Sequence, residues 1–533
     1  MLFSIRSPAN VRQYEGVLRS LAARGHEIQL VKEPFGTKWP PFVHQLVESC
    51  PSIRLGTLPP MKQDEWWEVA TQFRRVLFYL RFFGPVYRET PALLARTEKR
   101  APAWAVRLAR ACGAPGRWCL TRVVDLLEQS TRTAVHLQQY LRDQNPDLVV
   151  VTPLLVLKTA QLDLMRAATE LGVRNVFGTA SWDHLSSKSV LTLAPQRMLV
   201  WNDIQKQEAV DLHHVDPSRV VVTGAQVFDE WFDRTPSTTR AVFCERIGLR
   251  PDQPFLLYVC SSLLEASPDE PAFILRWVRH LRESGHAGLR ECGILIRRHP
   301  ERKEGWDQVD FTGLDNVVCW PPAGDSPVDR RSKTDYFDSL YHAVAVVGLN
   351  TSAMIEAAIV GRPVHTVLLP EFWENQEGTV HFHYLLKGPN AVLRATTSLD
   401  DHAREVAAIL DGHDPDPGRS ERFVRTFVRP AGLDVHSATR VVQELEALGS
   451  QAPPAPVPVP LRVRLLGPVI RLLLQPYARA VAAEILRAQE ELRREGEQRL
   501  ADHRQSKQPM LEEHRRRRIE EHRRRKKEAE EAS

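Results

Sequence analysis

The first residues of the chain alternate between short apolar runs and one amphipathic stretch. The runs "MLFSIRS" and "HEIQLV" have the apolar density of buried strands, and "VRQYEGVLRSLAARG" lies between them. In that middle stretch the apolar positions recur with the 3.6-residue period of a helix; they are Val11, Tyr14, Val17, Leu18 and Leu21. The pattern predicts a strand–helix–strand opening, which is typical of one half of a Rossmann-like domain.

The same alternation returns twice after a helical interruption. Residues from about 60 to 140 have a helical pattern and many aromatics, and strands alternate with helices from "DLVVVTP" to "RVVVTGAQVFDEWF". A second series begins at "PFLLYVCSS" and continues through "CGILIRRHP", "AVAVVGL" and "PVHTVLLP". Such alternation predicts parallel sheets that are covered on both faces. We therefore expect an α/β fold with two Rossmann-like doubly wound domains facing a cleft.

The boundaries follow from changes in composition. We expect the first domain over residues 1–235, with its helical insertion at about 60–140, and the second over 253–450. A Pro-rich linker at 451–460 precedes a helical, basic tail at 461–533. Ligands of paired α/β domains bind at the carboxyl ends of the strands, so the cleft is the expected site.

Composition narrows the class of protein. The chain has 533 residues, of which 43% are hydrophobic and 26% charged, and its seven cysteines form no CxxC pair. This is globular composition, and scattered cysteines fit a reducing compartment. The first residues lack a signal-peptide pattern, and no run of about 18 apolar residues occurs. We expect a cytoplasmic protein, either free or peripheral on the inner face of the plasma membrane.

The net charge of +5 belongs to the tail. Residues 461–533 contain 19 Lys and Arg and 13 Asp and Glu, so the tail carries +6 and the rest of the chain −1. Residues 461–481 hold four Arg and no acid among Leu and Val, with Pro468 and Pro476 expected to break the segment. Two interpretations stay open: a helix on an anionic membrane surface, or docking onto the first domain. The charge-dense remainder is expected to be solvated or disordered, and no nucleic-acid partner is expected because nothing base-reading accompanies it.

The aromatic run of the insertion also has two interpretations. Between residues 64 and 88 it mixes Trp, Phe and Tyr with Arg. Such a mixture occurs in helices at a membrane interface, and equally in the packed core of a helical insertion.

The stretch "GLNTSAMIEAAIVGRPV", residues 348–364, joins two apolar runs through a polar turn and a short helix. A helix that begins at a strand end points its free N–H groups at the cleft, which suits a phosphate or diphosphate. Asn350, Thr351 and Ser352 would present that end, and Glu356 could accept hydrogen bonds from a ribose. The alternative is an ordinary capped helix.

Other strand ends of the second half carry groups of the same kind. Arg298 and His299 follow "ILI" and suit a diphosphate leaving group, although surface charge before a turn is an equal alternative. Ser261 could donate to a phosphate or belong to a plain loop. Gln376 and Thr379 lie in the polar stretch "LPEFWENQEGTVHFHYLL". Its His-x-His has no further ligand at a recognisable spacing, so no metal is expected.

In the first half, the turn after the first strand lacks GxGxxG, which argues against a classical dinucleotide site. Arg6, Arg12 and Glu15 surround the start of the first helix and are candidates for the cleft. Arg12 and Glu15 are three residues apart, so a surface ion pair is as good an interpretation.

The loop "ASWDHLSSKS" follows another buried run. Asp183 beside His184 is a candidate general base, Trp182 could stack on a sugar, and Lys188 adds a cation. The alternative is a loop anchored by a buried Trp.

Together, these motifs resemble GT-B-type glycosyltransferases over about residues 1–447. The resemblance rests on "VRQYEGVLRSLAARGH", "SWDHLSSKS", "RVVVTGAQVFDEWF", "IRRHP" and "GLNTSAMIEAAIVGRPV…QEGTVHFHYLL". The chain resembles bacterial proteins of surface-polysaccharide type, and more distantly CDP-glycerol glycerophosphotransferases and non-hydrolysing UDP-N-acetylglucosamine 2-epimerases.

The resemblance implies a division of labour between the domains. The second domain would hold the nucleotide donor, with the diphosphate near Arg298, His299, Thr351 and Ser352 and the ribose near Glu356. The first domain would hold the acceptor, and no metal or cofactor would be needed beyond the nucleotide-activated substrate. Several inverting members carry a catalytic His after the first strand.

The loop "RSPANVRQ" has no such His, so Asp183, His184 or Glu15 would have to serve as base. A retaining enzyme would need no such base, and the stereochemistry stays open. The expected function is transfer of a sugar, or a related group such as glycerol phosphate, to a glycan or lipid-linked acceptor in surface glycan assembly. The alternatives are a sugar-nucleotide epimerase, a CDP-glycerol-type transferase and a non-catalytic scaffold.

Overall fold

The computed structural model describes most of the chain. The described residues are 1–34, 38–61, 65–131, 135–263, 269–300, 302, 304–322, 324, 327, 329–488, 490–491, 493–495 and 497–498. The tail beyond residue 498, expected to be solvated or disordered, lies outside them. Among the described helices, none combines the length and the apolar character that crossing a membrane requires.

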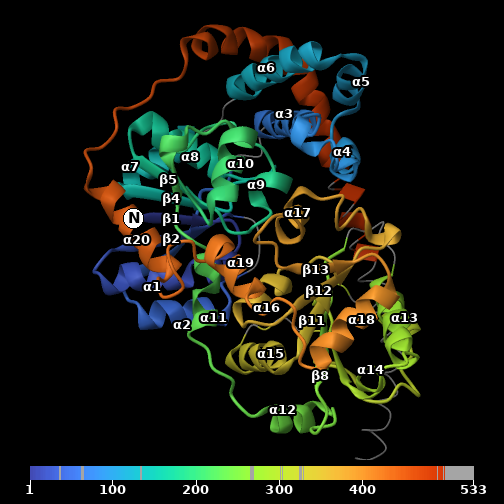
Figure 1. Ribbon diagram of the computed structural model, residues 1–533. Coiled ribbons are helices and arrows are strands. Elements are labelled where there is room, and N and C mark those ends of the chain that lie inside the picture. The colour runs from blue at the N-terminus through green and yellow to red at the C-terminus, as the bar shows by residue number, and fades with distance from the viewer. Residues whose placement is uncertain are drawn as a thin grey trace, which may run out of the picture.

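The first sheet has seven parallel strands in the order β3-β2-β1-β4-β5-β6-β7 (Figure 1). The strands are β1 (Leu2–Ile5), β2 (Ile28–Lys32), β3 (Ile53–Thr57), β4 (Leu148–Thr152), β5 (Arg174–Gly178), β6 (Arg197–Val200) and β7 (Val220–Val222). Every residue of β1, β4 and β5 is buried, as expected for strands covered on both faces. The main covering helices are α1 (Glu15–Ala23), α2 (Pro41–Ser49), α7 (Val135–Gln144), α8 (Gln161–Leu171) and α10 (Asp203–His213).

The second sheet repeats this winding with six strands, in the order β10-β9-β8-β11-β12-β13. They are β8 (Phe255–Val259), β9 (Gly293–Arg297), β10 (Val317–Cys319), β11 (Ala345–Gly348), β12 (Val364–Val367) and β13 (Leu393–Thr396). Its helices are α12 (Arg240–Ile247), α13 (Glu270–Arg282), α14 (Ala287–Glu291), α15 (Arg330–His342), α16 (Ala353–Ile359), α17 (Val380–Leu386), α18 (Leu399–Leu410) and α19 (Arg419–Phe427).

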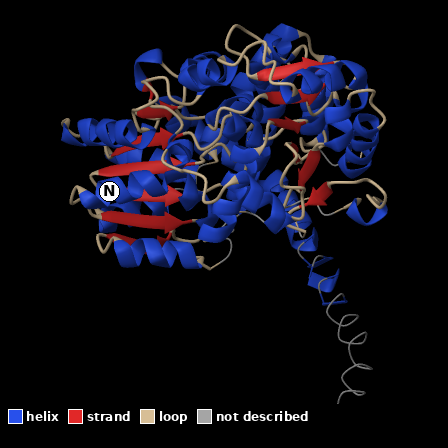
Figure 2. Cartoon of the chain, turned by 60° about the horizontal axis from the view of Figure 1, so that its bottom comes forward, coloured by secondary structure: helices blue, strands red, loops and turns tan. Residues whose placement is uncertain are grey.

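The two sheets lie apart, each surrounded by helices (Figure 2). In each, the strand order reverses beside the first strand, between β1 and β4 and between β8 and β11. That reversal is where doubly wound folds bind ligands. The structure confirms the predicted fold class of two Rossmann-like domains.

The helical insertion forms a separate layer above the first sheet in Figure 1. It consists of α3 (Glu65–Arg81), α4 (Pro91–Glu98), α5 (Ala103–Ala111) and α6 (Ala114–Ser130). Trp67, Phe73 and Tyr79 of α3 are each at most 2% exposed. These three aromatics of the run therefore pack in a core, and do not face a membrane.

A buried ion network fastens this layer to the sheet. The Arg74 guanidinium contacts Glu128 at 2.8 Å and Asp163 of α8 at 2.9 Å, and Arg166 also pairs with Glu128. Burial alone would raise the pKa of Glu128, but Arg166 and Arg74 hold it at about 2. The network joins α3, α6 and α8, so the insertion is held in one orientation.

The chain returns to the first domain after the second sheet. Helix α20 (Ser437–Ser450) packs Val441, Val442 and Leu445 against Leu18 and Leu21 of α1. Although α20 lies inside the range 253–450 expected for the second domain, its apolar face completes the core of the first, because α1 offers the matching stripe.

Residues 461–488 form one helix that docks on the insertion. It runs along α6 at the top of Figure 1 and then turns downward past α3. Pro468 and Pro476 therefore bend this segment without dividing it, in contrast to the sequence expectation, because contacts with α3 and α6 hold the turns together.

Candidate functional site

A cavity of about 970 Å³ lies between the two domains and takes walls from both. The first domain contributes the loop after β5 and the end of α4; the second contributes the turns after β9 and β11 and the segment before α17. The wall includes Trp182, Asp183, Lys188, His299, Asn350, Thr351, Ser352 and Thr379 from the sequence prediction. Segments that are far apart in the sequence thus meet at the carboxyl ends of the strands.

The turn after β11 is held by contacts behind the cavity wall. The Asn350 N–H donates to the Ser261 hydroxyl at 3.0 Å, and its side-chain amide donates to the Asn375 carbonyl. The Gln376 amide, 1% exposed, donates to the Leu349 carbonyl at 3.3 Å. Ser261 and Gln376 therefore position the turn from inside the fold, while Thr351 and Ser352 line the cavity.

Thr379 lies at the opposite rim of this turn. It precedes α17 and lines the cavity, and its hydroxyl donates to the Gln376 carbonyl at 2.9 Å. Because this bond uses its proton, the Thr379 hydroxyl can only accept a further hydrogen bond.

A smaller cavity of about 220 Å³ adjoins the first and shares His299, Thr351 and Ser352 with it. Arg298 and Glu356 line this smaller space. The Arg298 guanidinium lies 4.3 Å from the centroid of the Trp306 ring, which holds it flat. Glu356 accepts a hydrogen bond from the Tyr336 hydroxyl, and burial raises its pKa to about 7.

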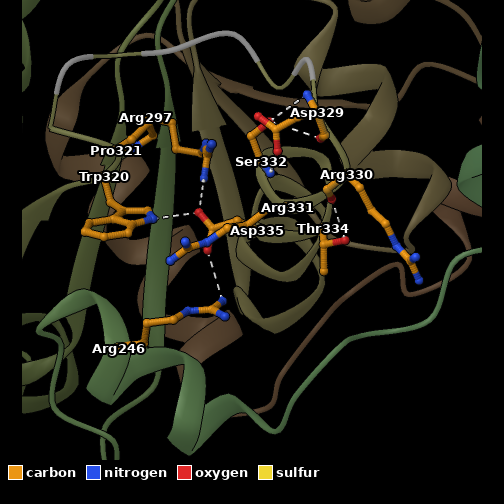
Figure 3. A pocket seen from close by; sticks show the side chains of 10 residues that line it. All are labelled: Arg246, Arg297, Trp320, Pro321, Asp329, Arg330, Arg331, Ser332, Thr334 and Asp335. Carbon is orange, nitrogen blue, oxygen red and sulfur yellow. Dashed lines mark hydrogen bonds and ion pairs between the residues drawn. The ribbon is translucent and has the colours of Figure 1, made fainter. Parts of the chain in front are cut away.

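Next to it, a third cavity of about 840 Å³ opens at the edge of the second sheet (Figure 3). Its centre is Asp335, which accepts from the Trp320 indole N–H at 2.6 Å and pairs with Arg246 at 3.0 Å. Arg297 reaches the same carboxylate at 3.6 Å and is 7% exposed. Arg297 therefore joins β9 to α15 by its contact with Asp335, and it lines both this cavity and the smaller one.

The loop after β5 begins from a close contact. A Cβ at Gly178 would lie 2.1 Å from the Tyr14 hydroxyl oxygen, so only glycine permits that tyrosine to donate to the Thr179 carbonyl at 2.9 Å. This contact fixes where the loop leaves the sheet. Trp182, 5% exposed, then packs edge-on against His381 with ring centroids 4.8 Å apart.

Asp183 is held as an anion in this loop. It accepts from the Ser181 hydroxyl at 2.7 Å and pairs with Lys188 at 3.0 Å. Burial alone would raise its pKa, but Lys188 and the neighbouring imidazoles hold it below its usual range. His184 lies behind the loop, where its Nδ1 accepts from the Ala180 N–H at 3.3 Å and burial lowers its pKa to about 4. Of this pair, only Asp183 lines the cavity.

His381 also lines the cavity wall. From the sequence, its His-x-His motif was weighed only as a possible metal site. It lies in α17, and its Nδ1 is 3.0 Å from the Ser187 hydroxyl of the first domain. Burial lowers its pKa to about 4, so the imidazole is neutral at pH 7 and can accept a proton. Within the described part of the chain, no group of three His, Cys, Asp or Glu side chains is arranged to hold a metal.

The residues around the start of α1 lie away from the cavity wall. Arg6 is 3.9 Å from Glu33, the Arg12 guanidinium lies 4.6 Å from the centroid of the Phe42 ring, and Glu15 pairs with Arg19 at 2.8 Å. Residues 8–14 form a 3-10 helix, so the side chains follow a period of 3.0 in place of 3.6. None of Arg6, Arg12 and Glu15 is part of the described wall.

The cavity wall is basic. It carries the cations Arg96, Lys99, Arg100, Lys188 and Arg302 and the anions Asp183 and Glu374, an excess of three positive charges. Three of these cations lie at or just beyond the end of α4, and sequence reasoning missed them because the insertion gave no sign of facing the cleft. Their spacing of three and four residues, on one helical face, was the available signal. An excess of fixed cations in a cleft favours an anionic ligand.

Known proteins similar to this chain are found among solved structures. No family model matches the chain, and no curated protein sequence matches it. A putative UDP-N-acetylglucosamine 2-epimerase from Listeria monocytogenes has 13% identity over 84% of this chain and 95% of its own, with a TM-score of 0.47. A glycosyltransferase from Rickettsia africae has 10% identity over 85% of this chain and 99% of its own, with a TM-score of 0.48.

A UDP-GlcNAc 2-epimerase from Neisseria meningitidis, bound to UDP-GlcNAc, has 11% identity over 84% of this chain and 99% of its own, with a TM-score of 0.47. Two Rossmann-like domains that face one cavity are the GT-B-like architecture that the sequence motifs indicated.

Proposed function

We propose that this chain is a GT-B-type glycosyltransferase, which transfers a sugar or a related group from a nucleotide-activated donor to an acidic acceptor. The observation that carries the proposal is the basic cavity of about 970 Å³ between the domains and the smaller cavity that opens from it. A donor and an acceptor must meet in one space, and this pair of cavities gives each its own side.

The donor side is supported by groups that suit a nucleoside diphosphate. Arg298 and His299 would neutralise the charge that develops on the leaving diphosphate, with hydroxyls of Thr351 and Ser352 beside them. Glu356, at the wall of the smaller cavity, would accept hydrogen bonds from ribose hydroxyls. In this proposal the protein's own cations supply the charge neutralisation.

The acceptor side is supported by the cations of the insertion. Arg96, Lys99 and Arg100 line the large cavity from the first domain, and an acceptor that carries phosphate or carboxylate would complement them. A glycan or lipid-linked acceptor of surface glycan assembly would meet this requirement.

Two wall residues are candidates for the proton acceptor. The Asp183 carboxylate is ionised but engaged by Lys188 at 3.0 Å, so it is a weak base that orients the loop. His381 lines the same wall and is neutral at pH 7, although its pKa of about 4 makes it a weak base in the free protein. The neighbouring Asp183 raises that pKa and would stabilise the imidazolium, so His381 is the better candidate for accepting the proton of an acceptor hydroxyl. His184 would act only by supporting the loop.

The nucleotide site is tested by titration calorimetry of UDP, CDP, ADP, GDP and dTDP. We expect one of them to bind the wild-type protein, and His299→Ala to weaken that binding by about tenfold or more, since hydrogen bonds to charged groups contribute about 1.5–3 kcal/mol. Arg12→Ala is the matched control, because Arg12 lies outside the described wall. If none of the nucleotides binds, the proposal is wrong.

An epimerase on the same architecture is the second candidate. It would convert its sugar nucleotide without any acceptor, so the basic acceptor side would serve no purpose. Proton NMR of UDP-N-acetylglucosamine incubated with the protein alone separates the two, because only an epimerase would yield a new hexosamine isomer. A non-catalytic scaffold would leave every donor intact in the presence of every acceptor.

A further inference from the structure

The helix at 461–488 has two apolar faces on opposite sides. Successive residues of an α-helix are rotated by about 100°, which places positions 461, 465, 469 and 472 within about 80° of one another. Positions 463, 474, 478, 481 and 485 fall on the opposite side. A helix that is apolar on two sides needs an apolar contact on each side.

The inner face of this helix packs against the helical insertion. Ala478 and Val481 are at most 5% exposed and pack with Phe73, Val76 and Val124 of α3 and α6. The Arg471 Nε also donates to the Ser130 carbonyl at 2.9 Å. The helix is thus firmly docked, which fixes the direction in which the other side points.

The outer face lies open to solvent. Its exposed fractions are 66% for Leu461, 65% for Leu465, 46% for Leu466, 54% for Val469, 75% for Leu472 and 73% for Leu473. Six large aliphatic side chains exposed within 13 residues exceed what an ordinary soluble surface carries, and such patches mark interaction sites. We call these six residues the outer leucine face.

The charges beside the outer leucine face have one sign. Arg462, Arg464 and Arg479 are exposed, and the first acid of the helix is Glu484. A helical segment with aliphatic residues on one side, Arg along it and no acid before Glu484 is complementary to an anionic bilayer surface. On such a surface the leucines would enter the acyl boundary and the guanidinium groups would meet phosphates. The helix does not need to span the bilayer for this contact.

We propose that the outer leucine face binds the surface of an anionic lipid bilayer and so holds the protein on the membrane. The chain beyond residue 498 is a poor alternative occupant, because its only large aliphatic residues are Leu500, Met510, Leu511 and Ile519 among dense charges. A protein partner is also disfavoured by the face itself, which lacks the Trp and Tyr that dominate protein interfaces.

The test is flotation of the full chain with vesicles of phosphatidylcholine containing about 30 mole per cent phosphatidylglycerol. We expect the wild-type protein to float with these vesicles and less with phosphatidylcholine alone. The double variant Leu465→Gln with Leu472→Gln should lower partitioning about 100-fold, since each leucine contributes about one factor of ten when it leaves water. Gln keeps the helix propensity, so folding is preserved.

The matched control is Ile204→Gln with Val242→Gln, two exposed aliphatic residues of α10 and α12. It should float like the wild-type protein. The proposal is overturned if the wild-type protein stays with the soluble fraction, or if the leucine variant floats equally well. It is also overturned if sedimentation velocity shows a dimer that only the leucine variant dissociates, because the face would then join two copies of the chain. Nucleotide binding is independent of these results, so either proposal can fail alone.

Discussion

Replacing Glu356 by Gln removes the negative charge of this side chain and keeps its size and shape. The carboxylate lines the smaller cavity, accepts from the Tyr336 hydroxyl and has a pKa raised to about 7, chiefly by burial. Glu230 raises this pKa further, and Arg297 lowers it. Near neutral pH the group therefore exists in both forms, and only the ionised form accepts strong hydrogen bonds from ribose hydroxyls.

The magnitude follows from that difference. A hydrogen bond to a charged group contributes about 1.5–3 kcal/mol and one between neutral groups about 0.5–1.5 kcal/mol, so ionisation should be worth about tenfold in affinity. We expect the affinity of the wild-type protein for a nucleotide-sugar to rise about fivefold between pH 6 and pH 8, since a group with a pKa of about 7 is only partly ionised at both ends of this range. Glu356→Gln should bind with the weaker affinity at both values of pH.

The assay is titration calorimetry with a nucleotide-sugar. Both of its phosphates are esterified, so neither titrates near pH 7. His299→Gln is the control for the imidazole in the wall of the smaller cavity, and its profile should keep the inflection near 7. If Glu356→Gln kept the inflection, or bound as tightly as the wild-type protein at pH 8, the assignment of this carboxylate to the ribose would be refuted.

The raised pKa of Glu356 also predicts how the free energy of unfolding changes with pH. Its folded pKa of about 7 lies above the unfolded value of 4.5, so the folded protein binds the proton more tightly. The free energy of unfolding therefore has its full contribution from this group below pH 4.5, and loses up to about 3 kcal/mol as the pH rises through 7. Urea unfolding at pH 5 and pH 8 should show a smaller difference for Glu356→Gln than for the wild-type protein.

Three further predictions address other parts of the structure. His381→Gln should lower the turnover number with a given donor and acceptor by about 100-fold or more, whereas Asp183→Asn should lower it less, and steady-state kinetics would count against the assignment if the order were reversed. Lys99→Glu with Arg100→Glu should raise the KM of an acidic acceptor at least tenfold and leave the donor KM unchanged; equal changes in both would point to a folding defect. Arg74→Ala should reduce the free energy of unfolding by about 3–5 kcal/mol in urea, because it leaves Glu128 and Asp163 short of a buried partner, and a loss below about 1 kcal/mol would contradict the buried network.

Local pattern predicted the elements and grouped several strand-end residues that line the cavities. The runs "LVVVT" and "FLLYV" are apolar throughout, and they became β4 and β8, with every residue buried. Parallel strands bring their carboxyl ends to one edge, so His299, Thr351 and Ser352 could be grouped from their places after predicted strands. Ser261 and Gln376 contact the same turn, but their hydrogen bonds inside the fold place them behind the described cavity wall.

Contacts between distant segments were beyond such reasoning. His381 and Ser187 are 194 residues apart and meet only because α17 of the second domain packs on α9 (His184–Ser187) of the first. The cations of α4 reach the cleft because a buried ion network orients the insertion. Residues 8–14 took the 3-10 period, which places Arg12 against Phe42, while Glu15 begins α1 and pairs with Arg19 one turn later.

The sequence by itself determined the α/β alternation, the two sheets and the strand-end groups, because burial leaves a periodic trace in the order of residues. It also determined that residues 461–481 are cationic and apolar, but left open whether they meet lipid or the first domain. Only the tertiary structure decided that one side of this helix packs on α3 and α6 while the other stays exposed. Periodicity records how much of a helix is apolar, whereas the path of the whole chain decides which surface meets each side.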